Sequence, residues 1–167
     1  VNFVLNNLCS QIGKSYDKGG DISKNGEIDV KLFKELNSLD FFKEVHPKSL
    51  GREWVEEFIN PILQRNTNSI ENKLRTFVEH IAFQIGEHLI DGEVLVTGGG
   101  TFNSFLIERI ENYSNSNIII PKKEIIDFKE AIIFAFLGVL KLEDKTNCLS
   151  SVTGAKKDCS GGDIYIK

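Results

Sequence analysis

Apolar residues recur at intervals of three and four positions in several stretches of the chain, and this spacing predicts amphipathic helices. The first stretch covers residues 1–12 and is expected to end at Gly13. Another, of about three turns, covers residues 30–39. A shorter stripe covers residues 54–62, with Pro61 near its end. The first part of the chain is therefore expected to be mainly helical.

The clearest helical pattern lies within residues 66–92. Its apolar face consists of Ile70, Leu74, Phe77, Val78, Ile81, Ile85 and Leu89. Thr67 or Asn68 is expected to cap the start of the helix, and Gly92 is expected to end it. His80 and His88 lack a partner at the spacing of a zinc-binding helix, so we interpret both as ordinary helix residues.

The second half of the chain alternates between strand and helix patterns. Strands are predicted at residues 94–96 and 117–121, with a helix at residues 103–111 between them. A helix at residues 128–142 is apolar on nearly all sides and is expected to be buried. The tail is predicted to be loop, with an edge strand at residues 164–166. This order predicts an α/β fold with at least one parallel strand pair.

Composition narrows the function classes. The chain has 167 residues, of which 41% are hydrophobic and 26% charged, the balance of an ordinary globular domain. Its net charge of -4 argues against nucleic-acid binding, which usually requires a basic surface. The longest apolar run, AIIFAFLGVL, is about half the length of a membrane span, so no membrane partner is expected.

The cysteines and the start of the chain add two expectations. Cys9, Cys148 and Cys159 form no C-x-x-C pair, so neither a zinc site nor a disulfide framework is indicated, and a cytoplasmic setting is expected. The chain contains no Met and begins at Val1, inside a helical pattern. We therefore expect it to be a piece of a longer protein.

Three consecutive glycines, Gly98, Gly99 and Gly100, lie where the first strand passes into a helix. Glycine permits a positive φ and close approach of a ligand, and a helix start presents unpaired N–H groups to an anion. The stretch is neither a dinucleotide fingerprint, because Asn103 replaces the third glycine, nor a Walker loop. A phosphate seat and a plain turn capped by Thr101 or Asn103 both remain open.

Five stretches of the sequence resemble a known family. VTGGGTFNSFLIERI is similar to the adenosine motif of sugar kinases in the actin, Hsp70 and sugar-kinase superfamily. In order along the chain, the five stretches resemble the C-terminal half of 1,6-anhydro-N-acetylmuramic acid kinases. They are GKSYDKGG (13–20), PKSLGREW (47–54), VTGGGTFN (96–103), FKEAIIFAFLG (128–138) and SVTGA (151–155).

The resemblance implies a fold and an activity. The fold would be a helix-rich α/β, actin-like (RNase H-like) C-terminal ATPase lobe with a small mixed sheet and a strand–GGG–helix unit, covering residues 1–167 as a single lobe. The parent enzyme would use ATP and Mg²⁺ to phosphorylate 1,6-anhydro-N-acetylmuramic acid while water opens its ring, in cell-wall recycling. The N-terminal lobe would be a partner and would hold the metal, and this chain alone is not expected to turn over. A homodimer is left open.

The resemblance also implies site residues. The ATP-binding group would be Thr97, Gly98, Gly99, Gly100, Thr101 and Asn103. Glu130 would contact the sugar, although an acid in the first turn of a helix is an equally good explanation for it. Lys48, Ser49, Arg52 and Glu53 could touch ligand or form a structural ion-pair loop, which we favour slightly. Tyr16 and Asp17 have the same two interpretations.

One position departs from the family pattern. Asn2 matches the Asn of the family's second phosphate motif, and the Asp that serves as the base then falls on Asn6. An amide cannot take a proton from water near neutral pH. The alternatives are a catalytically impaired protein that binds nucleotide or sugar, a different alignment at the start of the chain, and another actin-like protein with a different sugar. Phosphorylation of the sugar by the full polypeptide would distinguish them.

Overall fold

The computed structural model describes residues 1–45 and 48–165, in two compact units, Val1–Ile120 and Pro121–Lys167. In the first unit, the α-helices are α1 (Asn2–Ser10), α2 (Asp21–Lys24), α3 (Val30–Asn37), α4 (Arg52–Trp54), α5 (Asn60–Arg65), α6 (Ile70–Gly86) and α7 (Ser104–Asn112). Shorter helical segments are η1 (Lys18–Gly20), η2 (Asp40–Lys43), η3 (Val55–Ile59) and η4 (Gly99–Phe102). The strands are β1 (Glu93–Leu95) and β2 (Asn117–Ile119), and the second unit contains α8 (Lys123–Leu142) and α9 (Ser150–Thr153).

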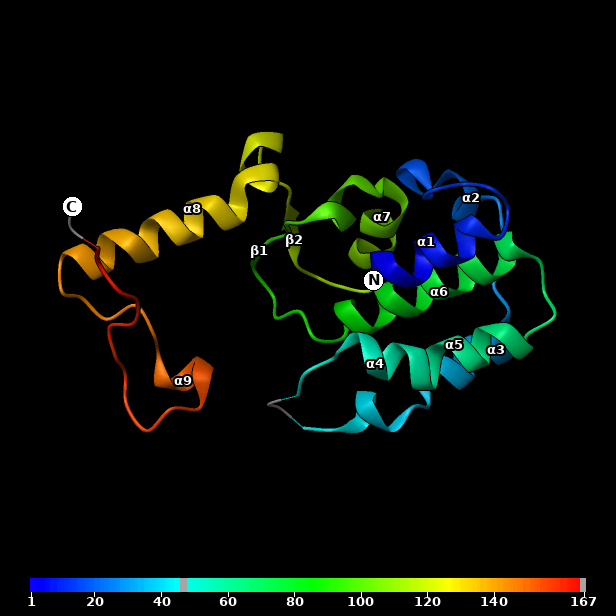
Figure 1. Ribbon diagram of the computed structural model, residues 1–167. Coiled ribbons are helices and arrows are strands. Elements are labelled where there is room, and N and C mark those ends of the chain that lie inside the picture. Colours follow the sequence, from blue (N-terminus) through cyan, green and yellow to red (C-terminus); the bar gives the residue numbers. More distant parts are fainter. Residues whose placement is uncertain (46–47, 166–167) are drawn as a thin grey trace. The chain divides into compact units, whose positions relative to one another are not determined.

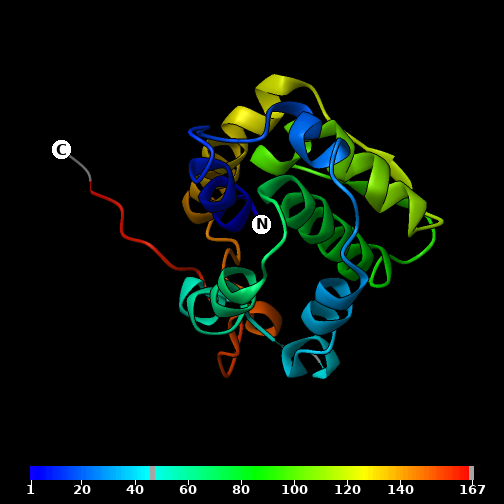
Figure 2. The same ribbon diagram turned by 90° about the vertical axis from the view of Figure 1, so that its right-hand side faces the viewer.

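Helix α6 is the centre of the first unit, and α1, α2, α3 and α7 pack against it (Figures 1 and 2). Leu74, Val78 and Ala82, which share one face of α6, are completely buried. Leu32 and Leu36 of α3 are buried to the same degree and belong to the same core. The apolar stripe predicted for residues 66–92 therefore does form the core.

The ends of α6 differ from the prediction. The N-cap is Ser69, whose Oγ accepts from the Asn72 N–H at 3.3 Å, and not Thr67 or Asn68. The helix ends at Gly86 and not at Gly92. A Cβ on Gly86 would lie within 3 Å of the backbone and side chain of Tyr113, so close packing favours glycine there.

The stripe at residues 54–62 is part of a longer helical run from Arg52 to Arg65. Pro61 lies within this run and not near its end. Proline lacks an N–H and crowds the carbonyl four residues earlier, which a regular α-helix cannot accommodate without a kink. The π-type segment Val55–Ile59 ends two residues before this proline and widens the hydrogen-bonding pattern there. The run therefore continues past the proline.

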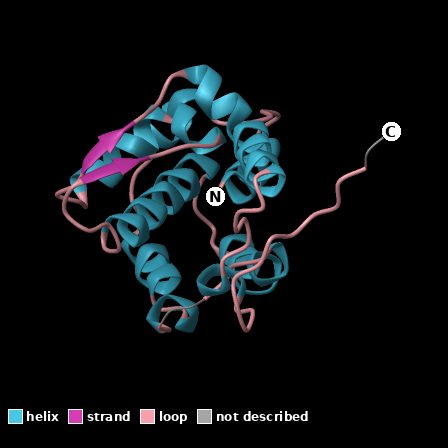
Figure 3. Cartoon of the chain, turned by 90° about the vertical axis from the view of Figure 1, so that its left-hand side faces the viewer, coloured by secondary structure: helices cyan, strands magenta, loops and turns pink. Residues whose placement is uncertain are grey.

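Strands β1 and β2 form a parallel pair with Glu93 opposite Asn117 and Leu95 opposite Ile119 (Figure 3). The expectation of a parallel pair is confirmed, and α7 is the crossover between the strands. The prediction of a mixed sheet was wrong for the described residues, because their sheet contains only this parallel pair. The observed arrangement is helix-rich α/β.

Two buried polar clusters lie on α6. The Glu79 carboxylate, 2% exposed, receives Arg109 at 2.7 and 2.9 Å and the Tyr113 hydroxyl at 2.7 Å. Burial alone would raise the pKa of Glu79. The hydrogen bonds from Arg109 and Tyr113 and the charge of Arg109 outweigh burial, so the pKa of Glu79 lies below its ordinary value. Neighbouring His80 is 3% exposed, and burial lowers its pKa to about 4. Its Nδ1 lies 2.8 Å from the Asn37 Oδ1.

In the second unit, helix α8 begins at Lys123, before the predicted start at residue 128, and its apolar side chains are not buried as expected. Phe128 is 61% exposed and Phe134 71%, whereas Ile126 is the buried residue of the helix. Apolar character on all sides predicts burial only where enough chain surrounds the helix. The described remainder of this unit is one short helix and loops, which leave most of α8 uncovered.

The tail of this unit contains a backbone bridge that the sequence did not predict, and it lacks the predicted strand at Ile164 and Tyr165. Cys148 and Cys159, whose spacing in sequence indicates no contact, lie opposite each other in an antiparallel backbone bridge. Both are free thiols. Ile164 and Tyr165 are not in a strand, and residue 166 of the predicted edge strand lies outside the described residues. Within the described ranges, we find no helix that combines the length and apolar character needed to cross a bilayer.

Candidate functional site

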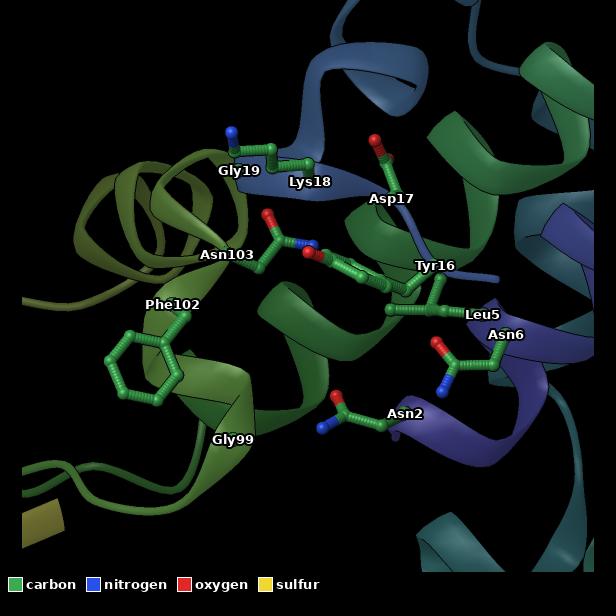
Figure 4. Close-up of a pocket in the computed structure, with 10 residues that line it drawn as sticks. All are labelled: Asn2, Leu5, Asn6, Tyr16, Asp17, Lys18, Gly19, Gly99, Phe102 and Asn103. Atoms are coloured by element: carbon green, nitrogen blue, oxygen red, sulfur yellow. The ribbon is translucent and has the colours of Figure 1, made fainter. Parts of the chain in front are cut away.

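A cavity of about 470 Å³ in the first unit brings together three segments that are far apart in sequence (Figure 4). Its walls are the first turns of α1, the loop before α2 and the glycine turn before α7. The lining residues are Asn2, Leu5, Asn6, Tyr16, Asp17, Lys18, Gly19, Gly99, Phe102 and Asn103. We call this space the Asn6 cavity. In Figure 4, the Asn2 and Asn6 amides enter from α1, and Phe102 and Asn103 lie on the opposite wall.

The glycine turn has separate requirements at two of its positions. Gly98 adopts φ 90° and ψ 172°, a conformation that side chains strongly disfavour. A Cβ on Gly99 would lie 3.0 Å from the Asn2 Nδ2, so glycine lets the turn approach the start of α1. Gly100 has neither constraint. Gly99 therefore lies close to the start of α1 and also lines the open cavity.

The turn is held by its own hydrogen bonds. Thr101 is buried, and its N–H and hydroxyl both donate to the Gly98 carbonyl, at 3.0 and 2.7 Å. The Asn103 Oδ1 accepts from the Leu106 N–H at 3.0 Å and caps α7, which confirms one of the two predicted caps. The Ser104 hydroxyl donates to the Gly19 carbonyl at 3.0 Å and joins the turn to the loop before α2.

Two helix starts and Lys18 at the cavity favour an anion, and Asp17 is the one acidic residue among its described lining residues. Helix α1 begins at the lining residue Asn2, and α7 begins directly after the lining residue Asn103. First-turn N–H groups of two helices therefore lie beside the cavity, and that of Leu106 already donates to the Asn103 Oδ1. Neither first turn contains an acidic residue. Lys18 lines the same space. A phosphate group would be well matched to these donors.

Asp17 has a structural role in this loop. It is 7% exposed, and its two carboxylate oxygens accept from the N–H groups of Ile22 and Ser23 at 2.8 and 2.9 Å. The Ser23 hydroxyl donates to it as well. These bonds order the loop before α2, so the structural interpretation of Asp17 is the better one. Tyr16, in contrast, is 57% exposed and lines the cavity.

Asn6 lies in the cavity wall with its side chain exposed. Among the described lining residues, Asp17 is the one carboxylate, and its oxygens are already hydrogen-bonded. A basic group that could activate water therefore has to come from outside these lining residues.

The residues predicted from sequence divide into two groups. Gly99 and Asn103 line the cavity, whereas Thr97, Gly98, Gly100 and Thr101 form the turn without lining it. The lining residues for which the sequence indicated no functional role are Leu5, Lys18, Gly19 and Phe102. Each lies within or beside a motif, and that adjacency is the signal that could have identified it.

The contacts of Lys48 and Arg52 support the structural interpretation of this motif. Lys48 donates to the Phe41 carbonyl at 3.0 Å and lies over the Phe41 ring. Arg52 pairs with Glu56 at 2.7 Å and lies over the Phe3 ring. Neither cation lines the Asn6 cavity, and the ion-pair partner of Arg52 is Glu56 and not the adjacent Glu53.

Glu130 does not lie at the helix start where the sequence placed it. Glu130 is exposed in α8, which starts at Lys123, so it lies beyond the first turn. The helix-dipole explanation for Glu130 was therefore wrong, and the acid in the first turn is Glu124. Within residues 1–45 and 48–165, no three His, Cys, Asp or Glu side chains cluster to hold a metal ion.

Comparison with known proteins identifies the family. A family model described as anhydro-N-acetylmuramic acid kinase matches residues 2–167. Kinases of that name from Sulfurovum sp. (strain NBC37-1) and Pasteurella multocida (strain Pm70) are 31% and 33% identical, over 91% and 93% of this chain and 44% of each relative. One from Bacillus cereus is 33% identical over 98% of this chain and 47% of the relative, so the chain spans less than half of these relatives. The chain belongs to the anhydro-N-acetylmuramic acid kinase family.

Proposed function

We propose that this chain is the nucleotide-binding, C-terminal lobe of a two-lobe kinase with an actin-like fold. The parent protein would transfer a phosphoryl group from ATP to 1,6-anhydro-N-acetylmuramic acid while water opens the anhydro ring. Such a reaction belongs to the recycling of cell-wall amino sugars, in the cytoplasm. The observation that carries the proposal is the Asn6 cavity, with its glycine turn and two helix starts, in a chain of this family.

The cavity residues fit the phosphates of ATP. Gly99 leaves the backbone open beside Asn2, and the N–H groups at the two helix starts supply donors for phosphate oxygens. Lys18 would add a positive charge, and Tyr16 and Phe102 would offer ring faces to a base. When bound, ATP supplies the phosphoryl group, and the role of these residues is to bind and orient it.

Mg²⁺ and the sugar would depend on other parts of the protein. The described residues hold no carboxylate cluster for a metal, so we assign no Mg²⁺ ligand to this chain. Glu130 remains our candidate for a sugar contact, on the family motif alone. The N-terminal lobe would complete both sites, and turnover is expected only for the parent protein.

An alternative function is favoured by Asn6. An amide at the position of the expected base cannot accept a proton from water near neutral pH. The parent could therefore bind nucleotide and amino sugar without efficient turnover. The test is the N6D variant of the parent: a large gain in phosphorylation would support impaired chemistry in the natural protein. An unchanged rate would show that the base lies elsewhere.

ATP binding by this chain tests the main proposal directly. Asn103→Asp retains an oxygen for the α7 cap but adds a negative charge to the cavity, so ATP affinity measured by calorimetry should fall at least tenfold, about 1.4 kcal/mol. Asn115→Asp makes the same charge change at an exposed loop position and is the control. Equal affinity of the two variants would refute the assignment of the cavity.

A further inference from the structure

A second cavity, of about 220 Å³, lies between α1, α5 and α6 in the first unit. It shares no lining residue with the Asn6 cavity. Its lining includes Lys73 of α6, Asn7 of α1 and Gln11 directly after α1, and Asn60 and Gln64 of α5. We call this space the Lys73 cavity.

Lys73 is the unusual residue of this cavity. It is only 8% exposed, yet its ammonium makes no ion pair or hydrogen bond with any residue that the structure describes. Arg75 Nε is the one unpaired polar side-chain atom that is fully buried among the described residues, so the Lys73 Nζ still reaches solvent. Lys73 is also one of the residues that line this cavity.

An unpaired cation in such a position costs free energy. Lysine is rarely buried without a partner, because removing its charge from water is compensated only by an opposite charge or by hydrogen-bond acceptors. No acidic side chain is among the residues that line the cavity. An opposite charge for Lys73 would therefore have to come from outside the lining residues.

The remaining lining residues suit such an anion. The side-chain amides of Asn60 and Gln64 have no hydrogen-bond partner among the described residues, and the Gln11 amide makes only a long contact, 3.5 Å, to the Asn7 carbonyl. Each amide NH₂ offers two donors to oxygen. One ammonium surrounded by several amides, beside an apolar wall, is a suitable arrangement for a small, oxygen-rich anion.

We propose that the Lys73 cavity binds a small oxyanion, with Lys73 as its charge partner and Asn60 and Gln64 as hydrogen-bond donors. Phosphate and carboxylate groups share this chemistry. The site is separate from the nucleotide site and does not depend on the function proposed for the Asn6 cavity. It lies on the other side of α1, which contributes residues to both cavities.

The experiment follows the side-chain ¹⁵N–¹H signals of Asn60 and Gln64 in this chain during titration with inorganic phosphate. Malonate is the second titrant, and sodium chloride at equal ionic strength is the blank. Saturable shifts with phosphate, malonate or both, absent with chloride, are the expected result, and the two arms distinguish the anion types. Shifts that never saturate, or that chloride reproduces, would overturn the proposal.

Three variants locate the binding. Lys73→Met keeps the apolar stem and should weaken the anion at least tenfold. Gln64→Glu places a carboxylate at an exposed lining position, where it should pair with Lys73, abolish the titration and raise the melting temperature without added anion. Lys18→Met removes a cation of the Asn6 cavity and should leave the titration unchanged.

Two outcomes would contradict the assignment. Binding that survives both Lys73→Met and Gln64→Glu would exclude Lys73 as the charge partner. Binding that is lost only in Lys18→Met would assign the anion to the Asn6 cavity. Gln64 is exposed, so Gln64→Glu should fold normally. The test therefore stays decisive even if the change at buried Lys73 disturbs folding.

Discussion

The buried imidazole of His80 should make the stability of this chain fall between pH 7.5 and pH 5. Its side chain lies among Phe42, Phe77 and Asn37, and burial lowers its pKa to about 4 from an ordinary 6.5. The unfolded chain therefore binds a proton more readily than the folded chain. The resulting stability is fully present above pH 6.5 and is lost as the pH falls toward 4.

The magnitude follows from the two pKa values. Their difference corresponds to about 3 kcal/mol in the low-pH limit, at about 1.4 kcal/mol for each pKa unit. At pH 5, about 2 kcal/mol of this should already be lost. Urea unfolding monitored by circular dichroism at pH 7.5, 6 and 5 measures the loss directly.

Two variants isolate the contribution of His80. His80→Phe keeps an aromatic ring between Phe42 and Phe77 but cannot titrate, so its stability should change by less than about 0.5 kcal/mol over the same range. His88→Gln, at an exposed position, should retain the full dependence of the natural chain. The reasoning is refuted if the natural chain loses no stability by pH 5, or if His80→Phe loses as much.

Three further changes test the packing of the first unit. Arg109→Met leaves Glu79 buried with weaker partners and should cost about 2–4 kcal/mol in urea unfolding; a cost below about 1 kcal/mol would show that Arg109 is dispensable. Leu74→Ala opens a cavity in the centre of α6 and should cost about 2–5 kcal/mol in the same assay, whereas an unchanged midpoint would contradict its burial. Gly20→Ala should lower the melting temperature by several degrees, because φ is 83° there and the new methyl group would meet Asn103 and Phe105. A melting temperature equal to that of the natural chain would exclude that contact.

Local patterns were sufficient for much of the fold. The stripe on α6, the parallel strands and the Asn103 cap follow from periodicity and cap chemistry that a few neighbouring residues determine. The end of α6 at Gly86 could not be predicted in this way, because it depends on Tyr113 in a distant segment. The exposure of α8 likewise depends on how much chain is available to cover it, which periodicity does not encode.

The two cavities also depend on contacts between distant segments, which local sequence patterns do not predict. Asn6 and Asn7 are adjacent polar residues within the amphipathic pattern of the first helix. Consecutive residues on a helix point about 100° apart, so the two amides line different cavities, one with Asn103 and one with Lys73. The partners that give each asparagine its chemistry come from α5, α6 and the glycine turn. Neither site is therefore visible in the sequence until tertiary packing has brought those partners to α1.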